Sequence, residues 1–74
     1  MMYEVVAPIP GLVARTPVKE GDFVNEGDTV IVLNVMKTEV NVQTERAGVV
    51  KEVKVKEWDE VDIGTILVII ESQG

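Results

Sequence analysis

Val35-Met36-Lys37-Thr38 lies between two apolar segments, Val30-Ile31-Val32-Leu33 before it and the alternating Val40-Asn41-Val42-Gln43 after it. Two such segments separated by so few residues predict a β-hairpin. The residues at its tip are poorly suited to a tight turn, which favours Gly, Asn or Asp because its central residues need φ > 0. A flexible apolar side chain and a lysine at such an exposed tip indicate selection for something other than folding. We therefore interpret Lys37 as the functional residue.

The hairpin joins two halves of the chain that resemble each other at a constant offset of 37 positions. Identical residues recur at this offset: Gly11/Gly48, Val13/Val50, Val18/Val55, Lys19/Lys56, Glu20/Glu57, Asp22/Asp59, Val24/Val61 and Gly27/Gly64. Each copy alone would expose an apolar face, so the two copies must pack on each other around an internal pseudo-two-fold axis. Short strands with frequent turns predict a small all-β sandwich or flattened barrel. If this symmetry holds, the tip and the chain termini lie at opposite ends.

Alternation and turn signals divide the chain into short strands. We predict strands over residues 2–7, 12–18, 29–35, 38–43, 49–56 and 66–70, a short apolar step at Phe23-Val24 and a polar tail over 71–74. The strand over 29–35 is rich in β-branched residues and is expected to be buried on both faces. Val40 and Val42 should share one face of the next strand, and Val53 and Val55 should point inward. Pro17 is expected to place part of its strand at a sheet edge, since proline has no N–H for the ladder.

The composition excludes several classes of function. A chain of 74 residues is one domain at most, which we take as 1–74, and it contains no Cys and no His. It therefore lacks thiolate chemistry and both the commonest general base and the commonest transition-metal ligand, and it is too small for a large ligand pocket. We expect no catalytic residue, no metal site and no independent enzyme. The net charge of −6 argues against binding nucleic acid or an anionic membrane. No signal peptide or membrane-spanning run is visible, so we expect no membrane insertion and a cytoplasmic location.

Four segments, in this order and at these spacings, resemble the biotinyl/lipoyl attachment domains, and within that family the biotin carboxyl carrier type. The segments are Ala7-Pro8-Ile9-Pro10-Gly11, the loop pair from Val18 to Asp28, Val35-Met36-Lys37-Thr38-Glu39, and Ala47-Gly48-Val49-Val50. The resemblance covers nearly the whole chain. It implies a flattened β-barrel or sandwich of two four-stranded antiparallel sheets, a barrel-sandwich hybrid, in agreement with the pattern of the residues.

The resemblance also implies a function for the hairpin tip. Lys37 stands where the family carries its biotinylated lysine, so biotin would be joined to it as an amide, and Val35, Met36 and Thr38 would be read by a biotin protein ligase. Glu39 would either contact the ligase or be the outward residue of its strand. The chain would be a non-catalytic carrier that moves a carboxyl group from a biotin carboxylase to a carboxyltransferase or decarboxylase. Tethering would act through effective concentration rather than affinity.

Three residues depart from the family pattern. Thr38 stands where a second Met or another apolar residue is usual, Val35 replaces an Ala, and Trp58 replaces the glycine of the second Gly-Asp loop. Trp58 is expected either to pack over the edge of the core or to contact a partner. Sister lipoyl domains usually carry Asp before the lysine and Ala after it, so Met36 matches the biotinyl side and Thr38 matches neither. No thumb insertion is seen between the early strands, which resembles thumbless carriers or a small free-standing attachment protein.

Two alternatives stay open. A lipoyl carrier of a 2-oxo acid dehydrogenase or glycine cleavage type system would use the same lysine with lipoate in place of biotin. An unmodified β module used for assembly would carry no group at all. Modification of Lys37 separates the assembly module from the carriers, and the identity of the attached group separates biotin from lipoate.

Overall fold

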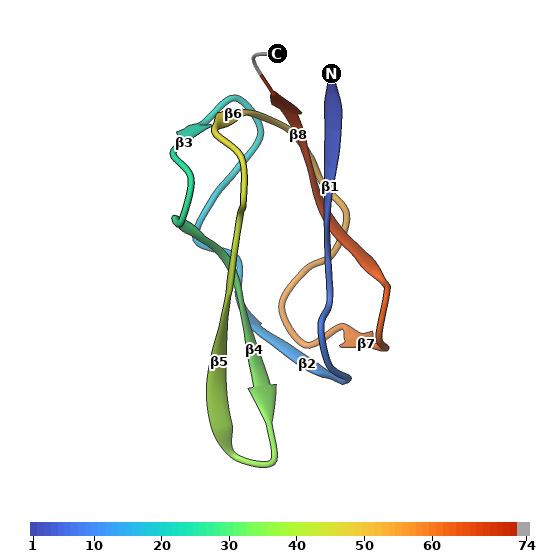
Figure 1. Cartoon of the computed structure of the whole chain (residues 1–74). Coiled ribbons are helices and arrows are strands. Elements are labelled where there is room, and N and C mark those ends of the chain that lie inside the picture. Colours follow the sequence, from blue (N-terminus) through green and yellow to red (C-terminus); the bar gives the residue numbers. More distant parts are fainter. Residues whose placement is uncertain (73–74) are drawn as a thin grey trace.

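The computed structural model describes residues 1–72, which form two four-stranded antiparallel sheets without a helix (Figure 1). The strands are β1 (Met2–Val6), β2 (Gly11–Arg15), β3 (Phe23–Val24), β4 (Thr29–Val35), β5 (Thr38–Gln43), β6 (Gly48–Val53), β7 (Glu60–Val61) and β8 (Ile66–Ser72). Their order is β1-β8-β6-β3 in one sheet and β5-β4-β2-β7 in the other. The predicted fold class is therefore confirmed.

The two sheets follow the symmetry of the sequence repeat. A shift of 37 positions carries β1–β4 onto β5–β8 and converts the strand order of one sheet into that of the other. Backbone hydrogen bonds repeat in the same way: the N–H of Gly21 donates to the Val50 carbonyl, and the N–H of Trp58 to the Val13 carbonyl, each at 2.8 Å. Each sheet takes two strands from each half of the chain. Neither half can therefore complete a sheet without the other.

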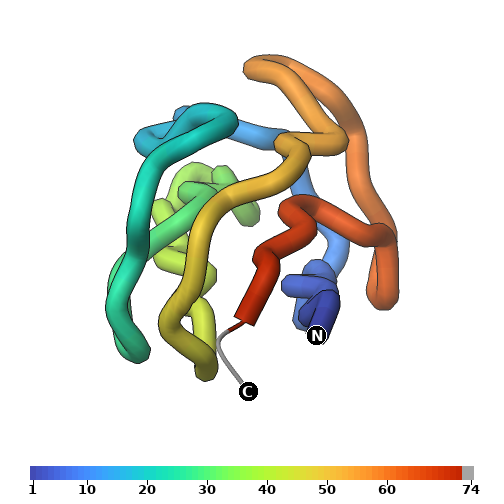
Figure 2. Tube along the Cα trace, turned by 90° about the horizontal axis from the view of Figure 1, so that it is seen from above, coloured from blue at the N-terminus to red at the C-terminus, as the bar shows by residue number. Residues whose placement is uncertain are grey.

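The core fills the space between the two sheets, and the trace in Figure 2 winds around it. Buried side chains come from both halves, and the central strands β4 and β8 supply most of the largest: Ile31, Leu33, Val30, Leu67, Val68 and Ile70. Four consecutive residues of β4, Val30 to Leu33, are buried, so its predicted burial on both faces is confirmed. Val42 is buried and Val40, Val53 and Val55 pack against the core, as alternation predicts. Adjacent side chains of β4 therefore cannot be exchanged for polar ones without loss of packing.

Strand bounds differ from the prediction mainly where the chain enters the long loops. β2 ends at Arg15 instead of residue 18, and β6 ends at Val53 instead of residue 56. Pro17 is not the reason, because the second half has no proline and its strand ends within one residue of the equivalent place. Both loops instead close on an aspartate: Asp22 accepts the N–H of Lys19, and Asp59 that of Lys56, each at 2.9 Å. This closure turns the chain away from its ladder partner.

Two smaller corrections concern the ends of the sheet that contains β1 and β8. The first strand ends at Val6, one residue earlier than predicted. Glu71 and Ser72, predicted as a polar tail, instead continue β8, where Glu71 pairs with Met2 and Ser72 with Gly48. The rest of that predicted tail, 73–74, lies outside the described residues. The repeat anticipates this result, since Glu71 and Ser72 correspond to the last two residues of β4.

Trp58 occupies a backbone position that favours glycine. Three turns in the described residues place a glycine at positive φ, namely Gly21 at 93°, Gly27 at 91° and Gly64 at 85°. The remaining equivalent position is Trp58, which has φ 75° and is 75% exposed. The alternative that Trp58 packs over the core edge is therefore wrong. A residue with a Cβ is strained in this region by roughly 1 kcal/mol, and here no burial compensates.

Replacement of Trp58 by Gly is expected to raise the free energy of unfolding by about 0.5–1 kcal/mol, because relief of the strain exceeds the extra entropy of glycine in the unfolded chain. Urea denaturation followed by circular dichroism measures this, since the variant lacks the only tryptophan. Gly21→Ala is the matched control at the equivalent turn and should change stability in the opposite direction. A destabilised W58G variant would show that the indole contributes packing.

Candidate functional site

The hairpin tip consists of Met36 and Lys37, the two residues that connect β4 to β5. The last ladder pair is Val35 with Thr38, so the loop is as short as a hairpin allows. Met36 has φ 51° and Lys37 has φ 69°, so both occupy the left-handed region, as in a type I′ turn. The expectation that this turn imposes positive φ on two unsuitable residues is confirmed. Asn-Gly at these two positions would adopt the same turn with less strain. Met36 and Lys37 each carry about 1 kcal/mol of backbone strain.

The tip is fully open to solvent at one end of an elongated molecule of 36 × 19 × 18 Å. Met36 is 93% exposed, and Lys37 is exposed as well. Among residues 1–72, no hydrogen bond or ion pair involves the Lys37 amine. Met1 and Ser72 meet at the other end, where the Ser72 N–H donates to the Met1 carbonyl at 2.7 Å (Figure 1). The predicted separation of the tip from the two ends of the fold is confirmed.

The hairpin below the tip is anchored from both sides. Val35 is half-buried and packs against the core, and Val40 does the same on the returning strand. On the solvent side, the two terminal guanidinium nitrogens of Arg15, Nη1 and Nη2, donate to the Glu39 carboxylate, at 2.9 and 3.1 Å. An exposed pair of this kind contributes at most about 1 kcal/mol to stability, but its bidentate geometry orients both side chains. The tip residues are therefore exposed to solvent, whereas the hairpin strands below them are held in place by packing and by this ion pair.

The predicted site residues separate into two groups in the structure. Met36, Lys37, Thr38 and Glu39 are exposed, whereas Val35 directs its side chain into the packing. Val35 thus has a structural reason to be apolar in addition to any recognition role. Glu39 is an outward residue of β5, and its ion pair with Arg15 was not foreseen from the sequence. The two residues are 24 positions apart, and only the arrangement of β2, β4 and β5 brings them together.

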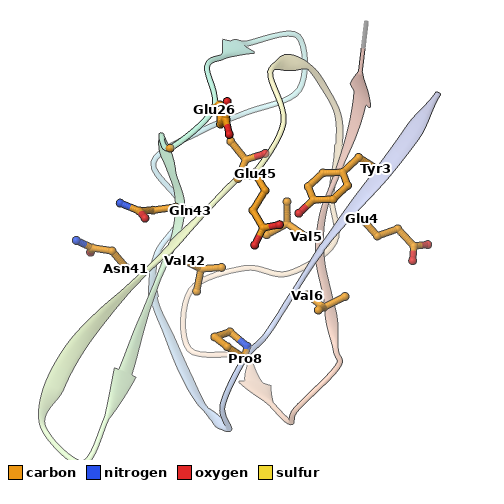
Figure 3. Close-up of a pocket in the computed structure, with 12 residues that line it drawn as sticks. Tyr3, Glu4, Val5, Val6, Pro8, Glu26, Asn41, Val42, Gln43 and Glu45 are labelled. Carbon is orange, nitrogen blue, oxygen red and sulfur yellow. The ribbon is translucent and has the colours of Figure 1, made fainter. Parts of the chain in front are cut away.

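A surface groove of the described residues lies away from the tip. It has a volume of about 480 Å³ and is lined mainly by residues of β1 with Pro8 and by the segment from Asn41 to Glu45, with Glu26 and Gly27 at its side (Figure 3). These two segments are equivalent in the repeat, so the groove lies across the pseudo-two-fold axis. It does not include Lys37, and no cluster of metal-ligating side chains occurs within residues 1–72. The candidate site is therefore the protruding lysine and not a pocket.

No helix long and apolar enough to span a membrane occurs in the part of the chain that the structure describes.

Comparison with known protein families identifies one match over nearly the whole chain. The family model described as biotin-requiring enzyme, which covers biotin and lipoyl attachment, matches residues 2–70. The biotin/lipoyl attachment protein of Bacillus subtilis is 43% identical over 53 residues, which are 72% of this chain and 73% of that protein. The biotinylated protein TB7.3 homolog of Mycobacterium leprae is 34% identical over 70 residues, 95% of this chain and 99% of that protein.

Other similar proteins are much longer than this chain. The dihydrolipoyllysine-residue acetyltransferase component of the pyruvate dehydrogenase complex of Cupriavidus necator is 46% identical over 59 residues, 80% of this chain but only 11% of that protein. Among solved structures, the urea carboxylase of Kluyveromyces lactis superposes with a TM-score of 0.90 at 28% identity over 96% of this chain and 6% of that one. These names cover both an enzyme of the carboxylase class and one of the lipoyl class.

Proposed function

This chain belongs to the family of biotin/lipoyl attachment domains, and we propose that within it the chain acts as a biotin carboxyl carrier with Lys37 as the attachment residue. The observation that carries this proposal is the tip itself: an exposed lysine with no ion pair among residues 1–72, preceded by Met36 and held in a strained turn on an ordered hairpin. As a carrier, the chain would be non-catalytic, and its partners would be a biotin protein ligase, a biotin carboxylase and a carboxyltransferase or decarboxylase.

Biotin is preferred over lipoate on three grounds. Met36 stands directly before the lysine, where the biotinyl type carries Met, and a similar protein of nearly the same length is named as biotinylated. Similarity to a urea carboxylase structure adds weight to carboxyl transfer. Lipoate is the second candidate, because the acetyltransferase component with 46% identity is a dihydrolipoyl protein by its name.

The geometry of the tip suits amide formation. The Lys37 amine lies outside the sheets with no competing partner among the described residues, so a ligase can approach it from several directions. Attack of the neutral amine on an activated carboxyl group forms the amide bond, expels the activating group and removes the charge of the lysine. When attached, biotin supplies a ureido nitrogen that accepts and releases a carboxyl group. The flexible lysine stem then provides reach, while the ordered hairpin limits the volume searched and keeps the effective concentration high.

The direct test is the intact mass of the chain after co-expression with a biotin protein ligase, followed by fragmentation to locate the modified residue. A biotinyl increment on Lys37 is the expected result. A lipoyl increment on Lys37 in cells that supply both groups would move the chain to the lipoyl carriers. An unmodified chain under both conditions would overturn the carrier proposal in favour of an assembly module.

Replacement of Thr38 by Met is expected to raise the rate of biotinylation about fivefold in kcat/KM, since one additional apolar contact worth roughly 1 kcal/mol in the transition state corresponds to that factor. A ligase assay with purified chain and radiolabelled biotin measures it. Thr38→Val is the matched control, because it removes the hydroxyl without adding length. A slower reaction of Thr38→Met would show that the ligase does not gain an apolar contact at this position.

A further inference from the structure

β7 and its two flanking turns form an acidic surface with two large exposed apolar side chains. We call the segment from Glu57 to Ile63 the β7 surface. Trp58 is 75% exposed at one end of it and Ile63 is 68% exposed at the other. Glu57, Glu60 and Asp62 are exposed between or beside them. Isolated exposed apolar residues are common on protein surfaces, so the question is whether the fold requires these two.

The internal repeat answers that question, because it contains the same turns at the other end of the molecule. The equivalent of Trp58 is Gly21, and the equivalent of Ile63 is Glu26. Gly21 and Trp58 make the same backbone hydrogen bond with the same sign of φ. The first half of the chain therefore forms the same two turns with Gly21 in place of Trp58 and Glu26 in place of Ile63. Neither apolar side chain is needed for folding.

Trp58 also carries a cost that nothing within the described chain offsets. Its backbone is held at φ 75°, its side chain is largely in solvent, and its indole N–H has no acceptor among residues 1–72. Tryptophan, with tyrosine and arginine, is enriched at the energetic centres of protein interfaces. A contact with a partner protein would supply this compensation.

The β7 surface lies in the same half of the molecule as Lys37. β7 pairs with β2 through Leu12 and Glu60, and the same Leu12 pairs with Asn34 of β4, three residues before Lys37. In Figure 1, β2 and β7 lie in the lower half of the view, which also contains the hairpin tip. Two strand spacings and three residues of strand separate the surface from the tip by roughly 15 Å. A standard interface covers about 800 Å² per partner, or roughly 30 Å across, so one partner can cover both.

The charges of the β7 surface define the chemistry of that partner. Lys56 pairs with Asp59 at 3.8 Å, but Glu57, Glu60 and Asp62 form no ion pair within residues 1–72. Their carboxylates leave the surroundings of Trp58 negative. A complementary surface would offer an apolar recess for the indole, bordered by Lys and Arg side chains.

We propose that the β7 surface docks the biotin carboxylase that acts on the group carried by Lys37, with Trp58 as the anchor. This inference rests on the proposed function. A ligase must hold the amine of Lys37 itself, so its contacts centre on the tip. A carboxylase receives the far end of a long arm, so its docking contacts can lie beside the hairpin instead of on it.

The test measures carboxylation of the biotinylated chain by the purified biotin carboxylase of the source organism, with ATP and bicarbonate. Trp58→Gly and Ile63→Glu install the residues of the equivalent positions, so both are expected to fold. Phe23→Glu is the matched control: Phe23 is 59% exposed, lies in the other sheet, and has Glu60 as its equivalent. We expect W58G to raise KM roughly tenfold with kcat unchanged, as for loss of an interface anchor, I63E to raise it less, and F23E to leave KM within about twofold.

A second readout separates docking from the other steps. The rate of biotinylation by the ligase should be the same for wild type and W58G, and labelling the single tryptophan with 5-fluorotryptophan should give a ¹⁹F shift when the carboxylase is added to the unmodified chain. An unchanged KM in W58G, an equal effect of F23E, or a parallel loss of biotinylation would each overturn the docking proposal. Failure of the proposed function is distinct, because it appears earlier as a wild-type chain without a biotinyl increment, and it would overturn this inference as well.

Discussion

Lys37→Arg abolishes covalent attachment while the fold is retained: this is the expected result with the largest effect on function. Arginine keeps the positive charge and the long stem, but its guanidinium stays protonated and cannot attack an activated carboxyl group. Lys37 is exposed and has no partner among the described residues, so the free energy of unfolding should change by no more than about 0.5 kcal/mol. Intact mass after co-expression with the ligase, together with urea denaturation, measures both quantities.

Lys56→Arg is the matched control, because Lys56 is another exposed lysine in a loop. It should be modified as fully as the wild type. Residual biotin on the Lys37→Arg chain would place the attachment elsewhere. Substantial unfolding of Lys37→Ala would contradict the solvated tip, since removal of an exposed side chain should not disturb the core.

Gly48→Ala is expected to cause the largest loss of stability, about 3 kcal/mol or more. Gly48 begins β6 against the end of β8, and a Cβ there would lie 2.8 Å from the carbonyl carbon of Glu71 and closer still to its oxygen. A backbone atom of a central strand cannot move aside as a flexible side chain can, so the ladder between β6 and β8 must open or shift. At about 0.05–0.15 kcal/mol per residue, a domain of 74 residues has a total stability of about 4–11 kcal/mol, so that loss is a large part of it.

Two glycine variants separate crowding from backbone conformation. Gly21→Ala introduces a Cβ at φ 93° but meets nothing within 4 Å, so it should cost only about 1 kcal/mol. Gly11→Ala, the equivalent of Gly48 in the repeat, meets the Asn34 carbonyl oxygen and a Val35 methyl group at 2.9 Å and should fall between the two. Urea denaturation followed by circular dichroism ranks them. A Gly48→Ala chain more stable than Gly21→Ala would show that β6 and β8 separate easily.

The strands around the tip could be predicted from the sequence because their signals are local. β4 and β5 have the predicted bounds, since a β-branched run and a strictly alternating run leave no choice of register across a two-residue loop. The strand ends at Arg15 and Val53 could not be predicted, because they depend on a loop closing on its own aspartate and on a bond to the other half of the chain.

The amino-acid sequence by itself determined the repeat, the alternation of its strands, the all-β class and the position of Lys37 at a strained hairpin tip, because each of these depends on residues close together or on a fixed offset. Only the tertiary structure decided how the halves interlock: two strands from each half in each sheet, the pairing of Arg15 with Glu39, and the approach of Gly48 to β8. It also decided that Trp58 faces solvent. These features depend on which residues distant in the chain become neighbours, and hydrophobic pattern and spacing do not encode that.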